Sequence, residues 1–132
     1  MSTFAFDAAR VAIEQPDNQF DLVGFADSNF GPESYLILQR AFEFDEQDTS
    51  LGMNTYHVEW CDQGNSGYGG VSRAMLTPSS VEFVFDSEGA EFLGGLRALK
   101  ISFQLEPAQF AELSRALERV FEGSGCLVIA DA

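Results

Sequence analysis

Short runs of alternating apolar and polar residues fill most of this chain, and short turns separate them. Alternation of this kind is typical of strands that bury one face. Joining two parallel strands takes a crossover of about a dozen residues, which most of these turns cannot supply. The spacing therefore predicts strands that run mainly antiparallel. The predicted strands are 3–14 (broken near Asp7), 20–26, 35–44, 53–61, 71–76, 81–85, 96–105 and 126–130.

A helical pattern follows the last long strand. Pro107 suits the first turn of a helix, where a missing N–H costs nothing, and Gly123 suits a left-handed stop. Between them runs one apolar stripe at helical spacing, made of Phe110, Leu113, Leu117, Val120 and Phe121. A shorter helical turn is expected at 87–93. We therefore expect an α+β fold, a mainly antiparallel sheet, curled or sandwich-like, packed by one C-terminal amphipathic helix. With 132 residues, 1–132 should form a single domain.

The segment 51–71 carries an unusual set of aromatic residues and glycines. It predicts a strand, a glycine-rich turn at 62–70 and a second strand. Alternation in the first strand places Tyr56, Val58 and Trp60 on one face, and Thr55, His57, Glu59 and Cys61 on the other. Tyr and Trp are favoured in protein interfaces because they join a large apolar area to a polar group. Tyr56, Trp60 and Tyr68 are therefore candidate partner contacts, with core packing as the alternative for the first two.

The charge of the chain is strongly negative, with 21 acidic against 7 basic residues and a net charge of −14. Such a charge disfavours nucleic acid and anionic membranes as partners and attracts a cationic one; solubility alone is the other explanation. The densest acidic stretch is expected to be a solvated loop over 43–50. Its carboxylates are candidate charged contacts at the rim of an interface, namely Glu43, Asp45, Glu46 and Asp48.

The sequence predicts no catalytic, metal-binding or cofactor-binding residue. His57 is the only histidine, and Cys61 on the same strand face lies about 13 Å away, too far for a nucleophile and its base. The acidic stretch lacks the central glycine and terminal Glu of a calcium loop. The glycines at 64–70 lack the Lys-Ser/Thr pair that ends a phosphate-binding loop.

The number of cysteines and the absence of targeting signals predict the cellular location. Two cysteines, Cys61 and Cys126, are too few for a disulfide framework. Residues 1–15 do not read as a secretory leader, and no apolar run is long enough to span a bilayer. We expect a cytoplasmic protein.

One combination of motifs resembles a known family. Its two main motifs are Leu-Gly-Met-Asn-Thr-Tyr at 51–56 and Tyr-Gly-Gly at 68–70. Gln39 and Gln47-Asp48 precede them, and a Glu-Phe-Leu-Gly turn at 91–94 follows them. The pattern, with the helix that carries Phe121, resembles immunity protein family ten of bacterial polymorphic toxin systems over about residues 33–122. The resemblance implies a small cytoplasmic protein that binds and neutralises a cognate toxin and catalyses nothing.

Taken together, these patterns favour a stoichiometric inhibitor that occupies a basic surface, such as the phosphate-binding cleft of a nuclease toxin. Two other interpretations stay open: a binding or regulatory module or subunit unrelated to toxins, and a small hydrolase that uses carboxylates. The oligomeric state is open as well, a homo-oligomer included.

Overall fold

The computed structural model describes residues 2–28, 33–51 and 54–130, which form strands, three α-helices and one 3-10 turn. In chain order the elements are β1 (Ser2–Asp7), β2 (Arg10–Glu14), η1 (Pro16–Asn18), β3 (Phe20–Ala26), β4 (Tyr35–Ala41), α1 (Glu46–Ser50), β5 (His57–Trp60), β6 (Asp62–Tyr68), β7 (Val71–Thr77), β8 (Ser80–Phe85), α2 (Ser87–Phe92), β9 (Leu96–Ser102), α3 (Pro107–Val120) and β10 (Leu127–Ile129).

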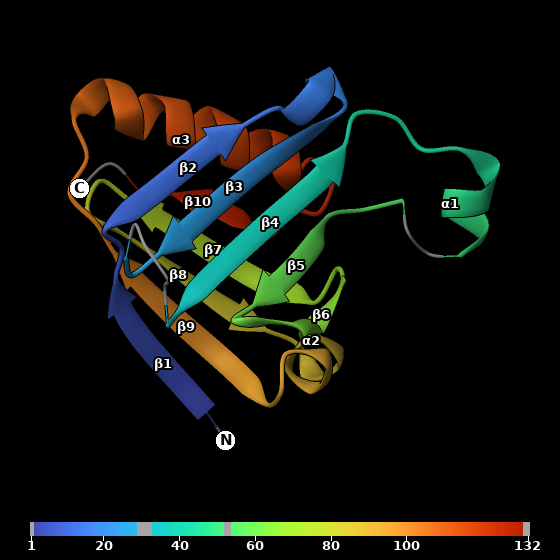
Figure 1. Cartoon of the computed structure of the whole chain (residues 1–132), viewed down its shortest axis with the longest axis horizontal. Helices are drawn as coiled ribbons and strands as arrows, with labels where there is room; N and C mark the ends of the chain where they lie inside the picture. The colour runs from blue at the N-terminus through green and yellow to red at the C-terminus, as the bar shows by residue number, and fades with distance from the viewer. Residues whose placement is uncertain (1, 29–32, 52–53, 131–132) are drawn as a thin grey trace.

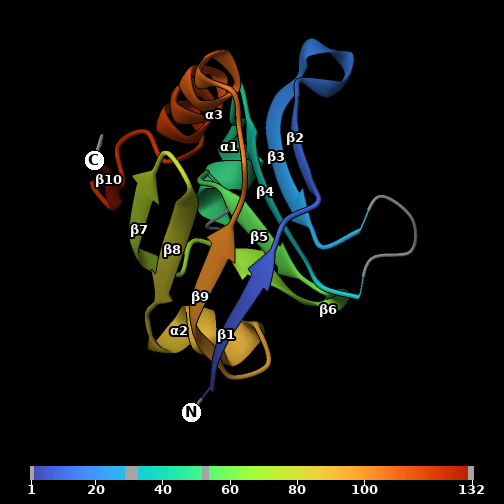
Figure 2. The ribbon, with the colours of Figure 1, turned by 90° about the vertical axis from the view of Figure 1, so that its left-hand side faces the viewer.

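Two five-stranded sheets carry the fold (Figure 1). Sheet A has the strand order β1-β9-β8-β7-β10, and sheet B has the order β2-β3-β4-β5-β6. Figure 2 shows them as two layers with α3 at one end. Helix α3 packs against β2, β3 and β4 of sheet B and against β10 of sheet A, so it joins the two layers. The predicted α+β class, with a C-terminal helix packed on the sheets, is confirmed.

Most strand pairs are antiparallel, as the short turns predicted. Two pairs depart from this pattern, because β1 runs parallel to β9 and β10 runs parallel to β7. Both involve the first or last strand of the chain, which is separated from its partner by long stretches of other structure. The argument from turn length holds only for strands that are neighbours in the sequence.

The predicted strand 3–14 is broken near Asp7, as expected, and its halves belong to different sheets. The Ala8 amide donates to the Ser102 carbonyl beside sheet A, while the Ala9 amide donates to the Ala26 carbonyl of sheet B, both at 2.8 Å. These two consecutive bonds fix the point at which the chain passes from one layer to the other.

The core lies between the two sheets. Phe25 of β3 faces Phe83 of β8 and Phe103 after β9, with ring centroids 6.4 and 6.2 Å apart respectively. The predicted helix stripe is confirmed, since α3 and the residue after it bury Leu113, Leu117, Val120 and Phe121. The apolar side chains of both layers and of α3 therefore form one cluster.

Two polar contacts hold α3 in place. Asp21 of β3 is only 5% exposed and accepts hydrogen bonds from Arg119 Nε and Gln15 Nε2, each at 2.9 Å. Arg40 of β4 donates from Nη1 to the carbonyls of Val120 and Glu122, at 3.3 and 2.6 Å. The second contact satisfies carbonyl groups that the end of a helix leaves without partners.

The acidic stretch 43–50 is not only a loop, because residues 46–50 form helix α1. Its N-terminus is closed by a reciprocal pair: the Asp48 amide donates to Asp45 Oδ1 at 2.7 Å, and the Asp45 amide donates to Asp48 Oδ2 at 3.1 Å. This is the capping-box geometry with Asp in the place of the usual Glu or Gln. The prediction missed it because the stretch has no apolar periodicity.

The glycine-rich segment 62–70 was predicted as a turn and is mostly strand β6. Only Gly69 and Gly70 turn the chain, with φ of +74° and +92°. Gly67 instead makes room for a side chain of α2, since a Cβ there would lie 2.6 Å from Phe92 Cδ2. The predicted strand 53–61 is shorter in the structure, where β5 covers His57–Trp60 and residues 54–56 are not strand. Met53 lies outside the described residues.

Replacing Gly89 by Ala should destabilise the protein by about 1–3 kcal/mol. A Cβ at Gly89 would collide with the carbonyl oxygen of Gly70, and neither backbone can give way without moving α2 or β7. Helix propensity alone predicts the opposite sign, a gain of about 1 kcal/mol for Ala over Gly. Urea unfolding of Gly89→Ala measures the difference. Gly24→Ala is the control, because a Cβ there meets nothing nearer than 3.9 Å.

Candidate functional site

The outer face of sheet B carries no helix. Figure 1 looks onto this face, and no helix among the described residues lies in front of its strands. Alternate side chains of the sheet point inward and are buried, as with Val23, Leu38 and Val58. Their neighbours in the chain point outward and are only partly covered. Antiparallel sheets commonly leave one face to solvent, so this face is available to a partner.

Strand register arranges the outward side chains in rows. Leu22, Gln39, His57 and Tyr68 lie side by side across β3, β4, β5 and β6. The next row holds Gly24, Ile37, Glu59 and Ser66. Side chains opposite each other on neighbouring strands are in direct contact range. His57 and Tyr68 meet edge to face, with ring centroids 4.9 Å apart.

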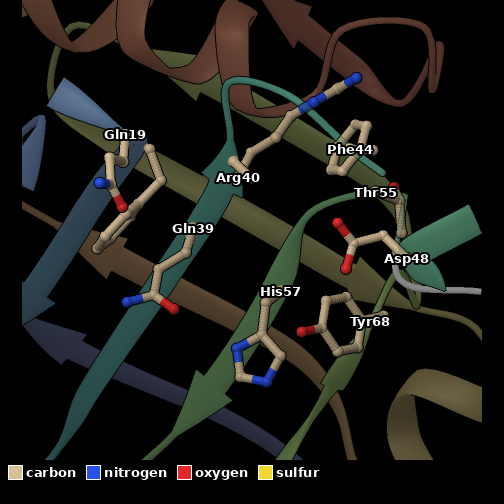
Figure 3. A pocket seen from close by; sticks show the side chains of 10 residues that line it. Gln19, Gln39, Arg40, Phe44, Asp48, Thr55, His57 and Tyr68 are labelled. Carbon is tan, nitrogen blue, oxygen red and sulfur yellow. The ribbon is translucent and has the colours of Figure 1, made fainter. Parts of the chain in front are cut away.

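Residues 43–50, which we call the α1 segment, stand beside this face. A hollow of about 320 Å³ lies between them, and we call it the α1 hollow. Figure 3 shows the carboxylate of Asp48 and the rings of His57 and Tyr68 facing the same space. Its walls come from five separate parts of the chain: the η1–β3 junction, β4, the α1 segment, the approach to β5, and β6. The lining residues are Gln19, Phe20, Gln39, Arg40, Ala41, Phe44, Asp48, Thr55, His57 and Tyr68.

The structure brings two of the predicted contact residues together in this hollow. Asp48 is half-buried in its wall, and Tyr68, which is 42% exposed, lines the same hollow. The other three acids of the predicted cluster, Glu43, Asp45 and Glu46, are exposed on the same α1 segment. A carboxylate beside aromatic faces is an arrangement that receives a cationic side chain.

Tyr56 is corrected from a contact residue to a core residue. Its side chain is only 4% exposed, and its ring lies 4.9 Å from that of Phe121. Its hydroxyl accepts a hydrogen bond from the Val71 amide at 3.0 Å. The alternation placed Tyr56 on the correct face with Val58, and that face is the buried one.

Trp60 also turns away from the outer face. It is half-buried, and its ring packs against Phe4 and Phe6 of β1 at centroid distances of 5.5 and 6.1 Å. Trp60 therefore ties strand β5 to the edge of sheet A, and it lies outside the α1 hollow.

Several residues of the hollow were not predicted as contact residues from the sequence, although Gln39 and Thr55 belong to the motifs of the family resemblance. Gln39, Phe44 and Thr55 are ordinary residues at their positions, and only the path of the α1 segment brings them together. Alternation did place Gln39 and His57 on strand faces opposite the core residues. That signal becomes useful only once the outer face of sheet B is known to be uncovered.

The polar groups around the hollow have altered proton affinities. Burial lowers the pKa of His57 below its usual 6.5, and the nearby Glu59 carboxylate opposes this effect. Next to it, the Tyr35 hydroxyl donates to Glu59 Oε2 at 2.6 Å, which raises the pKa of Tyr35 to about 12. Because its pKa is lowered, the imidazole of His57 is mainly uncharged at neutral pH. Arg40 contributes a cation to the wall, but its guanidinium is held by the two carbonyls at the end of α3.

Metal and thiol chemistry find little support in the described parts of the chain. Across residues 2–28, 33–51 and 54–130, no three His, Cys, Asp or Glu side chains gather in a way that could hold a metal ion. Cys61 and Cys126 are both free thiols, and burial raises the pKa of each. A raised pKa leaves less of the reactive thiolate at neutral pH.

The comparison with protein families decides the relationship of this chain. The family model described as Immunity protein 10 matches residues 7–111. This chain belongs to the immunity protein 10 family. The match confirms the family drawn from the motifs and extends the similarity toward the N-terminus, over β2 and β3. It ends at residue 111, so the last part of the resemblance, which includes Phe121, lies outside the match. No curated protein matches the chain.

In the residues that the structure covers, no helix has both the length and the apolar character needed to cross a bilayer.

The single histidine gives a direct test of the electrostatics of the hollow. In an NMR pH titration the His57 ring should titrate below 6.5. Glu59→Gln should lower that pKa further, because it removes the negative charge that favours the imidazolium. Glu91→Gln, on the exposed side of α2, is a control of equal charge that should leave the titration unchanged. A rise in the pKa of His57 in Glu59→Gln would contradict this account.

Proposed function

We propose that this protein neutralises a cognate toxin by binding it one to one, without catalysing a reaction. Membership of the immunity protein 10 family supports this role. The net charge of −14 supports a basic toxin surface as the target, such as the nucleic-acid-binding cleft of a nuclease. The protein would act in the cytoplasm, where an incoming toxin would meet its substrate.

One observation carries the location of the contact: the acidic α1 segment and Tyr68 lie at the same hollow. Glu43, Asp45 and Glu46 are exposed around it, and Asp48 reaches into it. We propose that an Arg or Lys side chain of the toxin enters the α1 hollow. There the Asp48 carboxylate pairs with its charge, and the Tyr68 and Phe44 rings cover its aliphatic or guanidinium part.

The two kinds of contact should differ in their kinetic effects. Exposed carboxylates attract a basic partner over a distance comparable to the Debye length, about 8 Å at physiological salt. They therefore raise the association rate and make it sensitive to salt. Tyr68 makes short-range contact only after docking, so its loss should mainly speed dissociation.

Neutralising the α1 acids should slow toxin association and flatten its salt dependence. The test variant is Glu43→Gln, Asp45→Asn, Glu46→Gln and Asp48→Asn together, with Asn keeping a side chain that can cap the helix. At low salt we expect the association rate to fall by about tenfold or more. Surface plasmon resonance at several salt concentrations measures it, against the toxin domain that this chain retains in a pull-down from lysate of its source cells.

The matched control removes the same charge elsewhere. Glu88→Gln, Glu91→Gln, Glu112→Gln and Glu118→Gln lie at exposed positions of α2 and α3. If this control slows association as much as the test variant, then net charge rather than the α1 segment guides the encounter. That result would remove the assignment of the α1 acids.

A further inference from the structure

A second depression on the outer face of sheet B is almost wholly apolar. It has a volume of about 320 Å³ and crosses β2, β3 and β4, and we call it the sheet groove. Among the residues that the structure describes, Arg10 is the one charged residue in its lining. The lining residues are Arg10, Ala12, Leu22, Gly24, Phe25, Ala26, Tyr35 and Ile37.

The groove results from small residues placed beside large ones. Register puts Ala12, Gly24 and Ile37 in one row, and Arg10, Ala26 and Tyr35 in the next. Because Gly24 has no side chain, the floor of the groove reaches down toward Phe25 of the core. A solvated sheet face usually carries polar or charged residues at such positions. Small and apolar residues here leave apolar surface exposed to water, which burial by a partner would stabilise.

The outer face of sheet A differs in composition. It also has a depression, lined partly by Val84 and Ala98, but an ion pair between Lys100 and Glu82 spans its strands at 3.8 Å. Arg73 is exposed on the same sheet. Arg10 in the sheet groove and Lys100 on sheet A are each paired with a glutamate, at 3.8 Å. The two faces differ in their remaining charges, because sheet A carries Arg73 and the α1 acids stand beside sheet B.

The sheet groove lies next to the α1 hollow. Leu22 lines the groove and Gln39 lines the hollow, and register places these two residues directly opposite each other on neighbouring strands. Neighbouring strands are about 4.8 Å apart. A partner patch of ordinary size, about 800 Å² per side, spans both depressions at once.

We infer that the sheet groove is the apolar centre of the toxin-binding surface and receives an apolar side chain of a basic toxin domain. This inference rests on the proposed function and adds the face and the kind of side chain that it recognises. The arrangement matches the usual anatomy of an interface, with an apolar centre and a polar, charged rim. In this arrangement the α1 hollow is the charged side of the contact.

Filling the groove without changing charge tests the inference. Gly24→Gln adds a long neutral side chain at a position where a Cβ meets nothing closer than 3.9 Å and where the backbone needs no positive φ. We expect the Kd for the toxin domain retained in the pull-down to rise at least tenfold, mainly through faster dissociation. Ala12→Gln, across the strand pair from Gly24, provides a second block of the same groove.

Ala98→Gln is the matched control, since it adds the same side chain to the depression on sheet A. Thermal unfolding of all three variants establishes that they are folded. The inference stands if both groove variants bind weakly and Ala98→Gln binds like the unsubstituted chain. Unchanged binding by the folded groove variants overturns it, as does an equal loss in Ala98→Gln. A natural chain that neither binds nor protects against this toxin overturns the proposed function itself, and the inference with it.

Discussion

Burial of one apolar cluster between two sheets is the interaction on which the rest of the structure depends. Phe25 and Phe83 meet across the layers, and α3 adds Leu113 and Leu117 where the sheets open toward it. Because the helix contributes to this interior, it is not available to cover the other side of sheet B. The uncovered face that we propose for toxin binding is therefore a consequence of how the core is closed.

The contact between β6–β7 and α2 shows how glycines serve packing in this protein. Gly70 and Gly89 bring two backbones together, and Gly67 lets the ring of Phe92 lie against the strand. The same Tyr-Gly-Gly sequence contributes to the motif shared with the family. Its second glycine, Gly70, lets the chain after β6 pack closely on α2. Its tyrosine, Tyr68, faces the α1 hollow. One short segment thus combines a structural constraint with a candidate contact.

The surface proposed for the toxin is divided by chemistry. Exposed carboxylates of the α1 segment supply long-range attraction, and the apolar groove around Gly24 supplies short-range contact. Between them lie Gln39 and a His57 whose pKa is lowered by burial. An uncharged imidazole at neutral pH adds no repulsion toward a basic side chain in the hollow.

The sequence by itself determined most of the strands, which of their side chains share a face, and where α3 begins, because these features depend on local alternation, helical spacing and Pro107. It also carried the motifs of the family. It did not determine that Tyr56 faces the core while His57 faces outward, that residues 62–68 are a strand, or that Asp48 and Tyr68 line the same hollow. Those facts needed the tertiary structure, because alternation separates two faces without saying which one another layer will bury, and because residues far apart in the chain meet only when the sheets are assembled.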